Sequence, residues 1–278
     1  MAFRNGSQFK AYLPREHGGW FLFLVPLAVG LGVAGQWNGR GPAFAVAALA
    51  LFLARPPLEL ALKAWRGKRT RADLPALLLC LAFYAALVAA AGGVLLLRER
   101  LWGLLPLAAA SAGLLALQLW AAAARLARTA WSEVIGTAGL ALAAPGAHYA
   151  AVGRWTATAI ALWILMAVVG VGGVLYSRWR LRRRRAAARV REDELPAAPP
   201  RVSVLAHYAL GLILAAALAW LGWAPWAVTP LYGLLLIRVA WGARPAARPD
   251  RTVLAIGLGE GIATIVSGLW IVLAYRLA

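Results

Sequence analysis

Long apolar stretches separated by short polar connections dominate the chain. A membrane-spanning helix needs about 20 mostly apolar residues, and nine stretches approach that length. The predicted spans cover about residues 14–35, 42–62, 74–97, 101–123, 131–152, 155–177, 203–221, 226–242 and 252–275. The eighth span, 226–242, is short, and we expect it to be tilted or to extend toward Trp223. The pattern predicts an all-α polytopic membrane helical bundle of about nine transmembrane helices, in a single membrane domain over residues 1–278.

The composition supports a membrane protein. The chain is 63% hydrophobic and 14% charged, whereas soluble domains are about half apolar and about one quarter charged. The formal charge of +19 would also suit nucleic acid. Its arginines and lysines lie in short runs between apolar stretches, however, which favours membrane topology over a nucleic-acid partner. Because Glu16, His17 and two glycines interrupt the first apolar junction, we expect an uncleaved first helix rather than a signal peptide.

The positive residues also predict the orientation of the spans. Of the 29 lysines and arginines, 23 lie in connections on the same side as the N-terminus, and five lie on the other side. The positive-inside rule therefore places the N-terminus in the cytoplasm and the C-terminus outside. The longest connection, residues 178–202, is predicted to be a basic cytoplasmic loop that begins as a projecting helix. Its arginines are expected to set the topology and meet anionic lipid headgroups, and a specific phosphate site is the alternative.

Aromatic and small residues fit the same picture. Tryptophans lie at the predicted membrane boundaries, as in an aromatic belt. They are Trp37, Trp102, Trp155 and Trp223 on the outside, and Trp65, Trp131, Trp179 and Trp241 on the inside. Glycine and alanine runs, such as the one from Gly170 to Gly173, predict close helix packing.

Ionisable residues in or beside the spans indicate a functional site, because charge is unfavourable in hydrocarbon. In the predicted topology nearly all of them fall in the cytoplasmic half, with little beyond His148 in the outer half. Since buried charges must be paired, we expect them to converge into one ligand-binding pocket open to the cytoplasm. The predicted binding residues are Arg15, Glu16, His17, Arg55, Glu59, Glu133, Arg178, Arg180, His207 and Glu260.

The predicted binding residues differ in their depth within the spans and in their neighbours along the sequence. Arg55 lies roughly 10 Å deep in the second span, and Glu59 shares its helical face. Glu260 is flanked by Gly257, Gly259 and Gly261, which would let a ligand or a neighbouring helix come close. For each residue alone, a structural ion pair or a snorkelling side chain is the competing interpretation, and we expect Arg238 to snorkel.

The candidate chemistry is limited. His17 and Glu260 are the candidate acid–base groups, so the sequence leaves enzymatic activity undecided. We expect no metal and no cofactor, because magnesium prefers clustered oxygen ligands and the carboxylates here are scattered. The sequence contains no P-loop and no HExxH motif, and no Ser/His/Asp set stands out in it.

The motif Pro14-Arg-Glu-His-Gly-Gly-Trp20, followed by Val25-Pro26, resembles the YwiC-like family of bacterial membrane proteins. Arg55-Pro56 and Gly257-Leu-Gly-Glu260 strengthen the resemblance, which extends over most of the chain. It implies a multi-pass protein of the bacterial cytoplasmic membrane and adds no reaction.

A more distant resemblance is to the UbiA superfamily of intramembrane prenyltransferases, which implies nine spans with the N-terminus inside. The stretch Lys68-Arg69-Thr70 to Pro75 is similar to the basic part of its first cytoplasmic motif. The aspartates that hold magnesium diphosphate in that family are absent. Arg55, Glu59 and Lys63 occupy the first position, and Arg178 and Arg180 the second. Metal-dependent prenyl transfer is therefore not expected.

Two hypotheses follow for the function. In the first, arginines at the cytoplasmic side bind an anionic amphiphile: an isoprenoid phosphate, a quinone-type headgroup or a phospholipid. Membrane lipids are then the partners. In the second, the chain is a transporter or an accessory membrane protein, and Arg55, Glu59 and Glu260 form a structural or proton-coupled network.

The pocket hypothesis predicts that Arg55→Ala removes bound anionic lipid while the protein stays folded. Native mass spectrometry of the purified variant beside the wild type measures the retained lipid. Unchanged lipid retention would contradict a pocket that depends on Arg55.

Overall fold

The computed structural model describes residues 17–67, 71–123, 129–187, 201–244 and 252–278. These residues form helices joined by turns, with no β-strand among them. Six of the helices are long and apolar enough to cross a membrane, and two shorter apolar helices cover Gly18–Ala34 and Trp226–Gly242. The predicted all-α polytopic bundle is confirmed.

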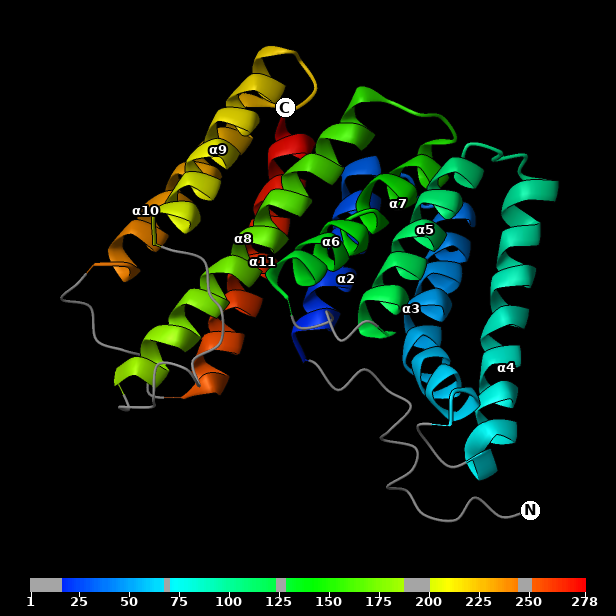
Figure 1. Cartoon of the computed structure of the whole chain (residues 1–278). Helices are drawn as coiled ribbons and strands as arrows, with labels where there is room; N and C mark the ends of the chain where they lie inside the picture. The colour runs from blue at the N-terminus through cyan, green and yellow to red at the C-terminus, as the bar shows by residue number, and fades with distance from the viewer. Residues whose placement is uncertain (1–16, 68–70, 124–128, 188–200, 245–251) are drawn as a thin grey trace.

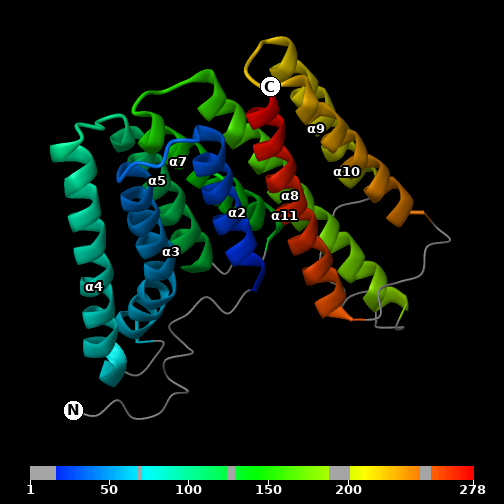
Figure 2. The same cartoon turned by 180° about the vertical axis from the view of Figure 1, so that it is seen from behind.

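The helices run alternately up and down (Figures 1 and 2). Three short turns interrupt the connections: the 3₁₀ turn η1 (Arg71–Asp73), the π-helical turn η2 (Val94–Arg98) and the 3₁₀ turn η4 (Trp226–Val228). The α-helices are α2 (His17–Ala34), α3 (Arg40–Trp65), α4 (Leu74–Gly93), α5 (Leu104–Ala123), α6 (Ala130–Leu140), α7 (Ala143–Val152), α8 (Ala157–Ala187), α9 (Arg201–Trp220), α10 (Thr229–Gly242) and α11 (Val253–Leu277).

The predicted fifth span differs from the expectation, because it is two helices, α6 and α7. Pro145 lies in the first turn of α7, where it cannot donate to the carbonyl of Ala141. That carbonyl instead accepts from the amide of Ala144, three residues on. The Trp163 indole of α8 donates to the carbonyl of Ala138 at 3.1 Å. These bonds satisfy the backbone at the break, as a low-dielectric environment requires.

Helix α8 lies at the centre of the bundle and packs against α2, α6, α7, α9 and α11. The largest apolar core forms around it, with Leu162, Leu165 and Met166 fully buried. Helices α3 and α4 pack together on one side, and α9 and α10 form a hairpin on the other (Figure 1). Close helix approach depends on small residues: a side chain on Gly30 of α2 would collide with the Ala144 carbonyl of α7.

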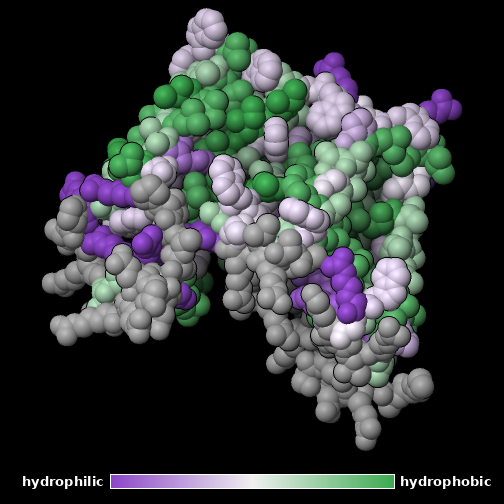
Figure 3. All heavy atoms as spheres, viewed as in Figure 1, coloured by the Kyte–Doolittle hydropathy of each residue, from purple (hydrophilic) through white to green (hydrophobic). Residues whose placement is uncertain are grey.

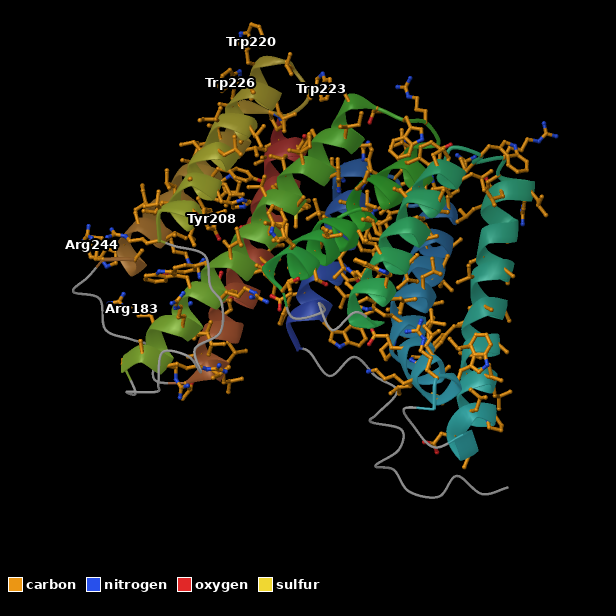
Figure 4. The ribbon with its side chains drawn as sticks, viewed as in Figure 1. Arg183, Tyr208, Trp220, Trp223, Trp226 and Arg244 are labelled. Atoms are coloured by element: carbon orange, nitrogen blue, oxygen red, sulfur yellow. The ribbon has the colours of Figure 1, made fainter. Side chains whose placement is uncertain are left out.

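The outer surface of the bundle is apolar over most of its length. Leu79 and Phe83 of α4 and Ile213 of α9 are exposed, as expected for side chains that face lipid. Exposed tryptophans lie near the helix ends. Trp220 and Trp226 lie at the tip of the α9–α10 hairpin, together with the half-buried Trp223 (Figure 4). This arrangement matches an aromatic belt.

The predicted orientation can be tested with reporter fusions. We expect green fluorescent protein fused after Ala187, at the end of α8, to fluoresce, because that end should lie in the cytoplasm. Alkaline phosphatase fused after Ala278 should be active, because the C-terminus lies at the opposite end of the bundle (Figure 1). Colony fluorescence and phosphatase activity report the two positions, and the reverse pattern would contradict the predicted topology.

Candidate functional site: an arginine-rich cluster around Glu260

Helix α8 continues past the predicted sixth span, which ends near residue 177, into the connection that was expected to begin as a projecting helix. At 1.5 Å per residue, its 31 residues span about 46 Å, which exceeds a hydrocarbon core of about 30 Å. The last turns carry six arginines between Arg178 and Arg185 and no acidic residue. Positive side chains also suit the negative pole of the helix dipole. We call this end of the bundle, where α8 and α10 end and α11 begins, the arginine-rich end.

At the arginine-rich end, two arginines from different helices share one carboxylate. Arg238 of α10 donates from Nη2 to Glu260 Oε1 at 2.5 Å and from Nη1 to Oε2 at 3.2 Å. Arg180 of α8 donates from Nη1 to Oε1 at 3.1 Å. The Glu260 and Arg180 side chains are only 11% and 17% exposed, and Arg238 is 32% exposed. We call Arg180, Arg238 and Glu260 the Glu260 cluster.

Aromatic rings hold the guanidinium groups in place. The Tyr176 ring lies 5.3 Å from the guanidinium carbon of Arg180 and 5.4 Å from that of Arg238. Tyr176 also stacks on Trp179, and Arg183 lies over the Trp179 ring. Such cation–π contacts stabilise arginine at partly desolvated sites. The cluster is thus built on a rigid aromatic support.

Arginines also join α10 to the end of α8. Arg183 donates from Nη1 to the carbonyls of Gly242 and Arg244, where α10 ends and lacks intrahelical donors. Arg183 and Arg244 lie near each other beside the lower end of α10 (Figure 4). Helix α10 packs mainly on α9, and Arg183 and Arg238 add polar contacts from α10 to α8 and α11 at this end.

Further ion pairs lie outside the Glu260 cluster, among them that of Arg40 with Glu99 at 2.6 Å. Arg178 of α8 makes a bidentate pair with Glu133 of α6, with both N–O distances 2.6 Å. Arg55 donates from Nε to Glu59 at 3.0 Å within α3, and this pair is more exposed. Bidentate Arg–carboxylate pairs between helices are stronger and more specific than surface pairs of the i,i+4 type.

The structure brings together some of the predicted site residues and separates others. Arg180 meets Glu260, and Glu133 meets Arg178. Within the described part of the chain, Arg55 and Glu59 contact each other and make no contact with Glu260. Among the described residues, Glu260 therefore does not join Arg55 and Glu59 in the predicted network.

The remaining predicted residues divide between structural roles and undescribed positions. His207 lies in the packed α8–α9 contact, where its Nε2 hydrogen-bonds the Val168 carbonyl at 3.0 Å. Arg15 and Glu16 lie outside the described residues, and His17 is described only as the first residue of α2.

Sequence reasoning misjudged one member of the cluster and missed another group. Arg238 was expected to snorkel, but it makes the bidentate pair with Glu260. Tyr176 went unnoticed, although its spacing of four residues from Arg180 places both on one helical face. The described residues contain no group of three His, Cys, Asp or Glu side chains placed to hold a metal ion.

Comparison with known proteins identifies the first half of the chain. Residues 13–149 match the family model described as YwiC-like protein. Over this region, the chain belongs to the YwiC-like family. Neither the curated proteins nor the solved structures give a match, so nothing is added to the resemblance to UbiA. Together with the apolar helices, the match makes the chain a multi-pass membrane protein.

The matched YwiC-like region contains only part of the predicted site. It includes Arg15, Glu16 and His17, together with Arg55 and Glu59 on α3 and Glu133 on α6. The Glu260 cluster comes from α8, α10 and α11, all beyond residue 149. The family match therefore says nothing of the cluster, which depends on the geometry alone.

The burial of the ion pairs predicts a difference in stability. Glu133→Gln should lower the free energy of unfolding by about 1–3 kcal/mol, because it leaves the mostly buried Arg178 without its bidentate partner. The matched change Glu59→Gln should cost about 0.5 kcal/mol, because an exposed i,i+4 pair contributes little. Thermal unfolding in detergent compares the two variants, and equal losses would contradict the assignment.

Proposed function

We propose that this protein binds an anionic amphiphile in the bacterial cytoplasmic membrane, with the headgroup at the Glu260 cluster on the cytoplasmic side. The observation that carries the proposal is the convergence of Arg180 and Arg238, from two helices, on a single carboxylate. Guanidinium groups bind carboxylate and phosphate in the same bidentate geometry. The Glu260 carboxylate therefore marks a position that suits an anionic headgroup.

The surroundings of the cluster favour an amphiphile over a soluble anion. Leu258 and Ile262 lie two residues before and after Glu260 on α11 and are exposed on the opposite face of that helix, and Ile237, which precedes Arg238 on α10, is also exposed. These side chains place exposed apolar surface on α10 and α11 at the level of the charged cluster along the helices. On the face in Figure 3, hydrophilic side chains gather at the arginine-rich end, and hydrophobic side chains cover most of α9 above them.

The chemistry of the cluster suits binding without metal. Candidate headgroups are an isoprenoid phosphate, a quinone-type ring with acidic character or a phospholipid. Arginines would supply the positive charge that a magnesium ion supplies in diphosphate-binding enzymes. Both Glu260 oxygens already accept hydrogen bonds from arginine, so we assign Glu260 to charge pairing with the arginines rather than to proton transfer. The proposal contains no covalent step.

A transporter or accessory membrane protein is the second candidate, favoured by the break between α6 and α7. Discontinuous membrane helices often line substrate or ion sites in transporters. The buried His148 of α7 contacts Thr156 at 3.2 Å on the far side of that break from Glu133. Solute uptake into proteoliposomes would favour this candidate, whereas lipid retention without uptake favours binding.

We expect Arg238→Gln to reduce the anionic lipid that remains bound after purification by about tenfold, since it removes the bidentate donor of the cluster. Native mass spectrometry measures the retained lipid. The matched control is Arg182→Gln, which removes the same charge from the arginine-rich end but leaves the cluster intact. Arg55→Ala serves as a second comparison, because Arg55 pairs within α3.

The comparison of variants distinguishes lipid binding at the Glu260 cluster from general electrostatic attraction. Equal lipid loss in the Arg238 and Arg182 variants would indicate attraction to the arginine-rich end as a whole. Lipid loss only in the Arg55 variant would move the site to α3. Addition of a chelator should leave lipid retention unchanged in the wild type.

A further inference from the structure

We propose that Glu260 is an internal counter-anion that the ligand replaces, and that the ligand carries a phosphomonoester headgroup. This inference rests on the proposed function and specifies the ligand class and how it is admitted. In the structure the arginines are held by the carboxylate, as they would be held by a ligand.

Geometry makes the carboxylate and the ligand alternatives. Glu260 Oε1 accepts from both arginines, and Oε2 accepts from Arg238. A second anion that takes the same Nη groups would lie within contact distance of the carboxylate. Two like charges at such a short distance repel each other strongly in a partly buried site. The ligand must therefore displace Glu260 from the guanidinium groups.

Charge and shape select the phosphomonoester. A carboxylate offers one negative charge and two oxygens to two guanidinium groups from different helices. A phosphomonoester carries about −1.5 to −2 charges and three terminal oxygens. It can thus pair bidentately with Arg238 and still offer an oxygen to Arg180. A phosphodiester has one charge and two terminal oxygens, so it gains little over the carboxylate that it would replace.

Two glycines lie directly against the charged atoms of the cluster. A Cβ atom on Gly173 of α8 would lie 3.6 Å from Glu260 Oε2, and one on Gly259 would lie 3.6 Å from Arg180 Nη1. Both distances are ordinary van der Waals contacts, and neither glycine places a side chain against the charged atoms. Tyr176 supports both guanidinium groups independently of the carboxylate. The arginines can therefore keep their positions when Glu260 moves, and the displaced carboxylate stays in the field of the arginine-rich end.

The test is a binding titration of purified full-length protein in detergent micelles. The probe is dioleoyl phosphatidic acid, compared with dioleoyl phosphatidylglycerol and with inorganic phosphate. We expect Glu260→Gln to raise the affinity for phosphatidic acid about tenfold, because the competing carboxylate is gone. Arg238→Gln should lower it about tenfold, and Arg182→Gln should leave it within about twofold of the wild type.

Glu260→Asp keeps the experiment decisive if Glu260→Gln does not fold. Aspartate retains the charge but is one methylene shorter, so it competes less well for two separated guanidinium groups. Its affinity for phosphatidic acid should lie between those of the wild type and the glutamine variant. Where Glu260→Gln folds, phosphatidic acid should raise its melting temperature more than that of the wild type.

The outcomes separate this inference from the proposed function. If Arg238→Gln weakens binding but neither Glu260 variant strengthens it, the exchange is wrong and the binding site stands. Unchanged binding in Arg238→Gln overturns the proposed function itself. Phosphatidylglycerol binding as tightly as phosphatidic acid contradicts the phosphomonoester assignment. Inorganic phosphate binding as tightly as phosphatidic acid keeps the exchange and contradicts the amphiphile.

Discussion

A charge placed among apolar helices needs a partner of opposite sign, and the structure depends on how that requirement is met. Glu260 lies on α11, where its neighbours along the sequence are glycine, leucine and isoleucine. Arg180 and Arg238 reach it from two other helices, and Tyr176 supports both guanidinium groups. The same contacts that compensate the buried carboxylate hold the ends of α8, α10 and α11 together. The same side-chain contacts therefore stabilise the fold and form the proposed site.

The two ends of the bundle are joined in different ways. The end opposite the arginine-rich end is joined by apolar packing, tryptophans, the hydrogen bond from Asn38 to the Ala151 carbonyl and the ion pair of Arg40 with Glu99. The arginine-rich end is joined by the long side chains of Arg180, Arg183 and Arg238. Long cationic side chains cover apolar surface while their charged groups reach the interface. In the predicted topology, an anion that arrives from the cytoplasmic leaflet would meet this end first.

Much of the fold was predictable from sequence because hydrophobic length is a strong signal. Within the described residues, each of the nine apolar stretches contains helix, and all but the fifth have the expected single helix. The break at Pro145 was missed because a proline within an apolar run does not by itself reveal whether the helix kinks or restarts. The site was harder to predict. Pairing between Glu260 and Arg238 depends on which helices are neighbours, and hydropathy does not encode that.

The central claim is that Arg180 and Arg238 form a headgroup site that Glu260 occupies in the absence of ligand. An experimental map of the wild-type protein in nanodiscs that contain phosphatidic acid tests this most directly. We expect density for a phosphate group within hydrogen-bond distance of both guanidinium groups, with the Glu260 carboxylate displaced. Glu260 still paired with both arginines, and lipid density only at other surfaces, would contradict it.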